Sequence, residues 1–498
     1  MKKRVLALSV ATIGLMVACA SEGPSKSPVA GKASDPGRAV LAANDGWAAA
    51  EGGVTGGAAA KPEHDVTVTS RKALVDALAL AGNAPKIIRI KGTINLSTDD
   101  AGRELTAKDY AVAPYNFDEY MKVYAPAVWN KTLVKGRPVR NLTGPQEEAR
   151  KASVTRQREQ VTIQLPSNTT LIGLGKDAKL VRGNIWIGAG VENVIIRNIA
   201  FEDAFDYFPA WDPGDSFKID KSYPGCQENY VDAKAGPQLC PGGRWNSEYD
   251  SISINGGKRV WIDHCSFSDG ARSDKLFPPV FPFPHNEITQ KVQHHDGAVD
   301  VTNAADLVTI SYSVFRDHDK TNLIGGSDSS KIDGGKLRVT FHHNWFENVG
   351  QRMPRVRFGK VHVYNNVYIG DATGSDDSKL SPYQNHVASL AIKSKITGNI
   401  FRQGLGIGKE SAVYSEANVF EIANGSVAQA AGNMGGSVFF DAGTLFNGKV
   451  VDLLAAINEA GKPLSAEVGW KPTLYAAKPL PATEVAAHVK AQAGPGKL

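Results

Sequence analysis

The sequence predicts an all-β fold in which short strands stack into a solenoid. A β-branched run, a small or polar residue and then an aromatic residue recur in segments that end at Phe201, Phe267, Phe315, Phe346, Tyr368, Phe401 and Phe420. Each segment is too small to close a core alone, so neighbouring segments are expected to stack. The intervals range from 19 residues (Phe401 to Phe420) to 66 residues (Phe201 to Phe267), which indicates loops inserted along one side. A β-sandwich would also give short strands separated by turns and is the alternative fold.

The first 20 residues predict a signal peptide. A positive start, Met1 to Arg4, precedes an apolar run from Val5 to Ala18 that is too short to be a mature membrane anchor. The end of this run resembles a lipoprotein box in which Cys19 becomes the lipidated first residue, and ordinary cleavage after a small-residue triplet is the alternative. We prefer the lipoprotein interpretation, so the chain is expected to be secreted or held on the cell surface or outer membrane of a bacterium.

A linker and two helices are predicted around the repeats. Residues 21–43 are rich in Ala, Gly, Ser, Pro and Lys, which is typical of a flexible tether, and the folded domain is expected over 44–498. Ser70 can cap a helix from Arg71 to about Leu80, and this helix would cover the first coil, whose strand edges and core are otherwise open. The charged segment 144–160 predicts a second helix on the surface.

The cysteines predict one disulfide and one buried thiol. Cys226 and Cys240 flank a polar segment that contains Gly and Pro, and export to an oxidising compartment would let them join. Cys265 lies in an apolar strand, where a cysteine usually acts as a small hydrophobic residue. The spacing of the four cysteines does not match a zinc finger.

The cationic residues indicate an anionic ligand. Arg352, Arg355 and Arg357 surround one proline, and guanidinium groups match carboxylates in geometry and charge. Lys320 ends a dense polar cluster, where it would either pair with a neighbouring aspartate or offer a point charge to a ligand carboxylate. The net charge is only +5, with no long basic run, recognition helix or RNA-binding aromatic motif, so an acidic carbohydrate is favoured over nucleic acid.

Three aspartates are candidate ligands of a hard cation such as Ca²⁺. Asp250 leads into one strand, while Asp296 and Asp300 are four residues apart and would lie on the same side of an extended segment. On spacing alone, aspartates that stabilise turns are the simpler interpretation of this pattern. The adjacent His294 and His295 lack further zinc ligands, so hydrogen bonding or packing is their expected use.

Several motifs, taken in order, resemble the secreted pectate lyases of polysaccharide lyase family 1. The similarity runs from about residue 44 to the end of the chain and rests on Trp261-Ile262-Asp263-His264-Cys265, His295-Asp296-Gly297-Ala298-Val299-Asp300, Asp317-His318-Asp319-Lys320 and Arg352-Met353-Pro354-Arg355-Val356-Arg357. The resemblance implies a right-handed parallel β-helix that cleaves polygalacturonate by β-elimination with the help of Ca²⁺.

The resemblance also implies a role for most of these residues. Arg352 would be the catalytic base, Lys320 and Arg357 would bind substrate carboxylates, and the calcium ligands would be Asp250, Asp296 and Asp300. Arg355 receives no role, and an ion pair that holds its loop is one structural interpretation. Because a calcium ion and neighbouring cations would disfavour the charged form of Arg352, we expect an alkaline pH optimum. The chain is expected to act as a monomer.

Three alternative functions stay open from the sequence. Glycoside hydrolysis would need two carboxyl groups free for proton transfer, which aspartates that hold a cation cannot supply. A pectin lyase would act on methyl-esterified polymer without calcium, and a non-catalytic binding protein would keep the cations but not need the base. Two segments depart from the family pattern as enlarged loops, residues 216–243 and the Pro/Phe-rich residues 277–284.

Overall fold

The computed structural model describes residues 35–129, 133–134, 137–138, 141–212, 217–218, 239–240, 244–277, 281, 292–373, 399–473 and 478–498. Its contacts divide the chain into residues Met1–Asp35 and Pro36–Leu498, and the fold described below belongs to the second unit. The predicted signal peptide, Cys19, Cys226 and the Cys240 side chain lie outside the described part, so export, lipidation and the disulfide stay predictions. No helix in the described ranges is long and apolar enough to cross a membrane.

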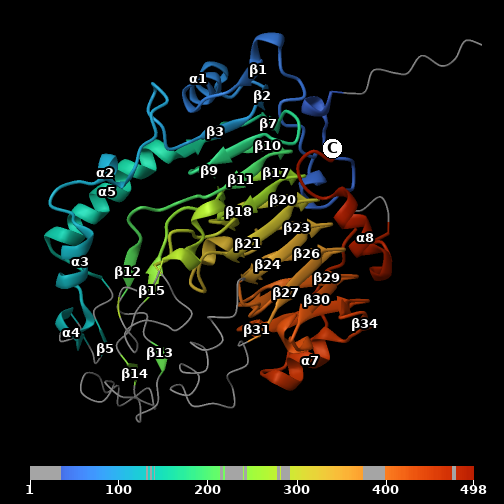
Figure 1. Cartoon of the computed structure of the whole chain (residues 1–498). Coiled ribbons are helices and arrows are strands. Elements are labelled where there is room, and N and C mark those ends of the chain that lie inside the picture. Colours follow the sequence, from blue (N-terminus) through green and yellow to red (C-terminus); the bar gives the residue numbers. More distant parts are fainter. Residues whose placement is uncertain are drawn as a thin grey trace, which may run out of the picture. The chain divides into compact units, whose positions relative to one another are not determined.

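Three long sheets run side by side through this unit (Figure 1). The first sheet has the order β1 (Asp65–Val68), β2 (Lys86–Ile90), β7 (Thr169–Gly173), β10 (Glu192–Arg197), β17 (Lys258–Asp263), β20 (Asp306–Ser311), β23 (Val339–His342), β26 (Lys360–Tyr364), β29 (Ala412–Glu416) and β32 (Val438–Ala442). The second sheet has the order β3 (Thr93–Asn95), β8 (Lys179–Val181), β11 (Ala200–Glu202), β18 (Ser266–Ser268), β21 (Val314–Lys320), β24 (Trp345–Gln351), β27 (Val367–Asp371), β30 (Val419–Ala423), β33 (Leu445–Phe446) and β34 (Lys449–Val450). The third sheet has the order β31 (Ala431–Met434), β28 (Leu405–Gly408), β25 (Arg355–Val356), β22 (Leu323–Ile324), β19 (Val299–Thr302), β16 (Ile252–Asn255), β9 (Asn184–Gly188) and β6 (Thr162–Gln164).

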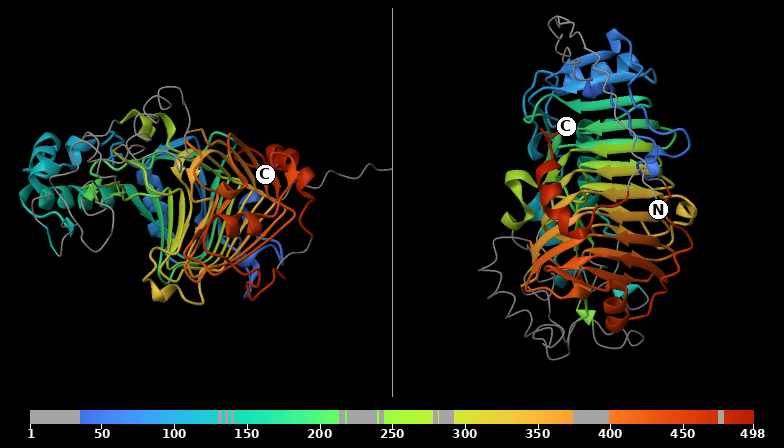
Figure 2. Two further views of the ribbon diagram at one scale, coloured as in Figure 1. Left: turned by 90° about the horizontal axis from the view of Figure 1, so that it is seen from below. Right: turned by 90° about the vertical axis from the view of Figure 1, so that its right-hand side faces the viewer.

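The order of the strands confirms a parallel β-helix. The chain passes from the third sheet to the first and then to the second, as in β16, β17 and β18, before β19 begins the next coil. Neighbouring strands of the three sheets pair in parallel, except that β33 and β34 are antiparallel. Figure 2 shows the strands of successive coils lying one above the other. Each strand therefore has its counterpart one coil earlier or later in the chain.

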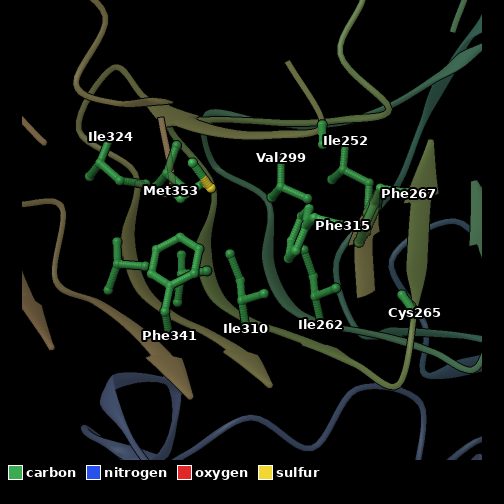
Figure 3. Close-up of a cluster of buried hydrophobic side chains, with 14 of the residues drawn as sticks. Ile252, Ile262, Cys265, Phe267, Val299, Ile310, Phe315, Ile324, Phe341 and Met353 are labelled. Atoms are coloured by element: carbon green, nitrogen blue, oxygen red, sulfur yellow. The ribbon is translucent and has the colours of Figure 1, made fainter. Parts of the chain in front are cut away.

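Six of the seven aromatic residues that mark the repeats stack inside the second sheet, while Phe401 is buried but belongs to none of its strands. Their ring centroids follow one another at 5.2, 4.9, 4.7, 4.9 and 4.2 Å along the series Phe201, Phe267, Phe315, Phe346, Tyr368 and Phe420. The rings are nearly parallel, and all six are buried with aliphatic rows from the other two sheets. Figure 3 shows two of them, Phe267 and Phe315, in this core. Cys265 is fully buried in this core, where burial raises the pKa of its thiol to about 12. The thiol thus acts as a hydrophobic residue, as the sequence predicts.

Helices close both ends of the coil stack. The predicted N-terminal helix is α1 (Arg71–Ala81), in which the Ala73 amide donates to the Ser70 hydroxyl at 3.2 Å and Leu74 and Leu78 join the core. At the other end, α7 (Leu453–Ala460) places Leu453 and Ile457 in the same core. This second cap was not predicted from the sequence. Both helices cover apolar side chains that an open terminal coil would expose to water.

The predicted second helix is α5 (Pro145–Val161), but it is less exposed than expected. Its buried face carries Glu147, Arg150, Ser153 and Gln157. Arg150 forms two hydrogen bonds with the Glu147 carboxylate, at 2.8 and 2.9 Å, and a third with the Phe208 carbonyl. Since the polar groups satisfy one another, the charged composition conceals a packed face. The sequence-based placement on the surface was wrong for this face.

The remaining elements are short. The other helices among the described residues are α2 (Ala107–Tyr110), α3 (Phe117–Val123), α4 (Pro126–Trp129) and α8 (Ala482–Gln492). Antiparallel pairs are formed by β12 (Ala210–Asp212) with β15 (Arg244–Asn246), β13 (Phe217–Lys218) with β14 (Leu239–Cys240), and β4 (Leu133–Val134) with β5 (Arg137–Pro138). Single turns of 3₁₀ helix lie at Pro36–Arg38, Trp47–Ala49, Pro62–His64, Gly270–Arg272, Asp274–Leu276, Lys331–Asp333 and Val427–Gln429.

An asparagine ladder joins the turns between the first and second sheets. The Asn344 side-chain amide donates to Asn366 at 2.9 Å, and that of Asn366 donates to Asn418 at 3.1 Å. All three side chains are buried.

Removing the middle rung of the asparagine ladder would leave buried backbone groups without partners, so we expect Asn366→Ala to lower the free energy of unfolding by about 1–3 kcal/mol. Urea denaturation measures this loss. Asn83→Ala removes an exposed amide and should change the stability little; an equal loss in both variants would contradict the ladder's role.

Candidate active site

The third sheet presents one row of side chains to the core and the next row outward. Ile254, Val301, Ile324 and Val356 are paired in register across successive strands and are buried. Side chains alternate between the two faces of a strand, so their neighbours Asp300, Leu323 and Arg355 belong to the outer row. The outer face of this sheet therefore carries a carboxylate and a guanidinium group that the sequence places 55 residues apart.

Two of the three predicted aspartates converge beside Gly297. One oxygen of Asp250 accepts from the Gly297 amide at 2.9 Å and the other from the Ser253 hydroxyl at 2.6 Å. One oxygen of Asp300 accepts from the Leu323 amide at 2.9 Å. A Cβ atom at position 297 would lie 2.7 Å from Asp250 and 2.5 Å from Asp300. Only glycine lets both carboxylates approach this point.

Burial and mutual repulsion raise the pKa of both carboxyl groups. Burial is the larger cause for Asp250, and the charge of Asp296 adds to it, raising its pKa to about 7. The pKa of Asp300 is raised well above its usual range by burial and by the charges of Asp250 and Asp296. Two buried carboxylates with incomplete neutralisation form a site that a cation would stabilise.

The third predicted aspartate faces a cation of the protein itself. Asp296 pairs with the Lys320 ammonium group at 2.8 Å, and the same ammonium donates to Gln293 at 3.2 Å. Burial would raise the pKa of Asp296, but the charges of Lys320 and Arg352 outweigh it and lower the pKa. Across the described residues, no group of three or more His, Cys, Asp or Glu side chains has the arrangement of a formed metal site. The pairing of Asp296 with Lys320 explains why the three aspartates do not all face one point.

A buried histidine fixes the backbone at Lys320. The Nε2 atom of His318 lies 2.9 Å from the Lys320 carbonyl oxygen, and its Nδ1 atom contacts the buried Asp269 carboxylate. A second buried histidine, His295, bridges Asp274 at 2.7 Å and Asp203 at 3.1 Å. The expectation that His295 is used for hydrogen bonding is confirmed. The partners Asp203, Asp269 and Asp274 were not predicted from the sequence, because no spacing along the chain connects them with the histidines.

The three arginines differ in their partners. Arg357 donates from Nε to Asp328 at 2.6 Å and from Nη1 to the Gly325 carbonyl at 2.9 Å. The buried Nε atoms of Arg352 and Arg355 have no hydrogen-bond partner in the described part of the chain. The expected ion pair of Arg355 is not found among the described residues. Arg352 lowers the pKa of Asp296 and of Asp300, which places its charge beside the carboxylate site.

The backbone holds Arg352 in a conformation that few non-glycine residues adopt. Its φ angle is 63°, in the left-handed region. Its carbonyl oxygen accepts from the Asn322 amide and from the Thr321 hydroxyl, both at 2.8 Å. These bonds from the preceding coil fix the peptide unit, and residues held this way often mark functional sites. The sequence cannot show this strain.

The histidine network predicts a loss of stability at alkaline pH. Burial alone would lower the pKa of His318, but the Asp269 charge and hydrogen bond, together with Asp274, raise it despite the nearby charge of His295. A folded-state pKa above the unfolded value of about 6.5 stabilises the fold fully below pH 6.5, and this contribution disappears as the pH rises through the folded-state pKa.

We therefore compare the wild type with His318→Gln, which keeps a hydrogen-bonding side chain but cannot be charged. Urea denaturation at several pH values between 6 and 10 gives the free energy of unfolding of both proteins. At pH 6 this free energy should be larger for the wild type than for His318→Gln, and the difference between the two proteins should decrease toward pH 10. A difference that is constant with pH would show that His318 is not charged in the folded protein.

The fold and the site together define a parallel β-helix protein with carboxylate and guanidinium groups gathered on the outer face of one sheet. A family model described as pectate lyase matches residues 11–120, 139–232 and 228–498. The chain is 40% identical over 474 residues to a pectate lyase of Bacillus subtilis (strain 168), covering 95% of this chain and 96% of the relative. It is 32% identical to pectate lyase E of Dickeya chrysanthemi, covering 93% of this chain and 88% of that protein. The chain belongs to the pectate lyase family.

Solved structures agree with this assignment. A structure described as pectate lyase bound to hexasaccharide has a TM-score of 0.76 and 39% identity, and the match covers 93% of this chain and all of that chain. The pectate lyase from Acidovorax avenae subsp citrulli also has a TM-score of 0.76, with 34% identity over 94% of this chain and 99% of that one. The predicted family and fold are thus confirmed over nearly the whole length of the chain.

Proposed function

We propose that this protein is a pectate lyase that cleaves de-esterified polygalacturonate by calcium-dependent β-elimination and leaves 4,5-unsaturated oligogalacturonates. The proposal rests on the surroundings of Arg352. Its buried Nε has no hydrogen-bond partner in the described residues, and its charge lowers the pKa of Asp296 and of Asp300. Membership of the pectate lyase family supports this reaction and substrate, as does the sugar-bound relative.

Arg352 is proposed to take the proton from C5 of a galacturonate residue. The neutral guanidine form of Arg352 accepts the proton as the C5–H bond breaks, and the electrons of that bond form the C4–C5 double bond. The bond from C4 to the glycosidic oxygen breaks with the electron pair going to oxygen, which then takes a proton from water. A general base must be held within reach of the proton it removes. The two hydrogen bonds to the Arg352 carbonyl provide that position.

Lys320 and Arg357 are proposed to bind substrate carboxylates. Both are largely buried, with side-chain exposures of 9% and 11%, so their charges are little screened by water. The Asp328 partner of Arg357 is 61% exposed, and a substrate carboxylate can replace it at small cost. Lys320 would exchange Asp296 for substrate in the same way. Positive charge near the reacting carboxylate stabilises the negative charge that develops during elimination.

The proposed calcium ligands are Asp250, Asp296 and Asp300. The fit rests on the two buried carboxylates beside Gly297, whose pKa values are raised by burial and by repulsion between the aspartates, and a divalent cation would offset both. Oxygen ligands of this kind suit Ca²⁺. When bound, the ion would neutralise the substrate carboxylate and make the C5 proton more acidic. Asp296 would join the other two ligands after Lys320 releases it.

The alternatives account for fewer of these contacts. Hydrolysis would need a carboxyl group free to donate a proton, whereas Asp250 and Asp300 are proposed to hold the cation and Asp296 is kept as a carboxylate by Lys320. A pectin lyase acting on methyl-esterified polymer would have little use for the aspartates beside Gly297. A non-catalytic binding protein would use the cations without a base, and membership of a family of lyases favours the enzyme. We further propose export directed by residues 1–20, with Cys19 as a lipid anchor and a disulfide between Cys226 and Cys240.

The reaction is tested by following ultraviolet absorbance of the new double bond on polygalacturonate. We expect the wild-type protein to produce it and Arg352→Lys to lower kcat by about 10²–10⁴-fold, because a general base contributes about that much. Substrate binding should persist in the variant. Arg316→Lys, at an exposed position on β21, is the matched control. Reducing ends without ultraviolet absorbance would indicate hydrolysis, and near-normal turnover of Arg352→Lys would exclude the proposed base.

The metal is tested by chelation and titration. A chelator should abolish activity and added Ca²⁺ should restore it, while Asp300→Asn should weaken calcium binding by about tenfold or more. Because protons compete at Asp250, whose pKa is raised to about 7, calorimetry should show the affinity falling as the pH drops below 7. Asp177→Asn, at an exposed position, is the control. Full activity in the chelator would rule out the requirement for calcium.

A further inference from the structure

Arg355 is a cation without an ion-pair partner, among the described residues, on the face that carries the proposed chemistry. Its buried Nε has no hydrogen-bond partner there either. Arg357, two residues further on, has both an aspartate and a carbonyl group as partners. A partly buried guanidinium group is stabilised only when its donors are paired. The surroundings of Arg355 would therefore be completed by an anion.

The strand register places Arg355 in the same outer row as the carboxylate site. Arg355 on β25 is paired with Leu323 on β22, and the Leu323 amide donates to Asp300. On its other side, Arg355 is paired with Gly406 on β28. Neighbouring strands lie about 4.7–4.9 Å apart, which is close to the length of one pyranose ring. A sugar chain that crosses the strands would thus meet about one strand with each residue.

A glycine on the next strand leaves room for the Arg355 side chain. A Cβ atom at position 406 would lie 3.1 Å from the Cγ atom of Arg355 and 3.0 Å from the sulfur of Met434. Position 432, paired with Gly406, is also glycine, and the Gln403 side chain occupies the space above it. The stem of Arg355 therefore lies over β28, in the direction away from Asp300. A side chain at 406 would displace it.

The other two arginines make this position strongly positive. Burial first, and then the charges of Arg357 and Arg352, lower the pKa of Arg355 to about 10. The exposed Asp328 is the nearby charge that acts in the opposite direction. A carboxylate bound here would compensate burial and repulsion together.

We propose that Arg355 binds the carboxylate of a galacturonate residue next to the one that reacts at Arg352. This inference rests on the proposed function and deepens it, because it makes the enzyme require two neighbouring unesterified residues. Arg355 would act in binding and not in proton transfer. Its contribution should then be the same in the ground state and in the transition state, and should appear in KM with little effect on kcat.

The experiment compares Arg355→Gln and Arg355→Lys on polygalacturonate and on the same polymer with partial methyl esterification. Losing a charged hydrogen bond should raise KM of Arg355→Gln for polygalacturonate by about tenfold or more, with kcat within about threefold of wild type. Arg355→Lys keeps the charge and should recover part of the affinity. Esterification of the polymer should raise KM of the wild type more than KM of Arg355→Gln, because the variant lacks the guanidinium group that binds the substrate carboxylate.

A control variant tests whether the rise in KM is specific to Arg355. Arg316→Gln removes an exposed charge on β21, so an equal rise in its KM would show that bulk charge is responsible and would overturn the inference. An unchanged KM in Arg355→Gln, or a loss in kcat alone, would overturn it as well. Should Arg355→Gln fail to fold, Arg355→Lys decides: its KM for polygalacturonate should exceed that of the wild type with kcat unchanged, and a wild-type KM would overturn the inference. Absence of unsaturated product from the wild-type protein would instead refute the proposed function.

Discussion

Parallel pairing in register between successive coils is the constraint on which the remaining structure depends. Because side chains alternate along each strand, one register fixes which residues form the core and which reach the outer face. Val301, Ile324 and Val356 follow one another inward, while Asp300, Leu323 and Arg355 follow one another outward. A slip by one residue would exchange the two rows and place charged groups in the core. The stacked rings and the asparagine ladder hold the register in the other sheet and at the turn.

The same register creates an unequal distribution of charge on the outer face. Asp250 and Asp300 stand together with little compensation, while Asp296 is neutralised by Lys320. On the arginine side, Arg357 is paired, and Arg352 and Arg355 lack hydrogen-bond partners at Nε among the described residues. Unpaired groups of both signs thus occur on one surface, a costly arrangement for folding alone. It is the arrangement expected of a site that is completed by a cation and an acidic ligand.

A buried network supports this surface from behind. His318 contacts Asp269 and the Lys320 carbonyl, so the position of the lysine depends on groups that never reach the substrate. His295 is held between Asp274 and Asp203, directly before Asp296 in the chain. Low mobility of the surrounding core allows such contacts to set the orientation of exposed groups. Residues of this kind show no pattern along the chain, because their partners come from different coils.

The sequence by itself determined the solenoid class, the aromatic stack, the capped helix at Arg71 and the residue types of the site, because local periodicity and the order of motifs are encoded along the chain. It misjudged α5, whose charged composition conceals mutual hydrogen bonds between Glu147 and Arg150. It gave no sign of the cap formed by α7 or of the Asp269 contact to His318. Only the tertiary structure decided that Asp296 pairs with Lys320 and that Nε of Arg355 has no partner among the described residues, because both depend on distances between coils that are set by loops of unequal length.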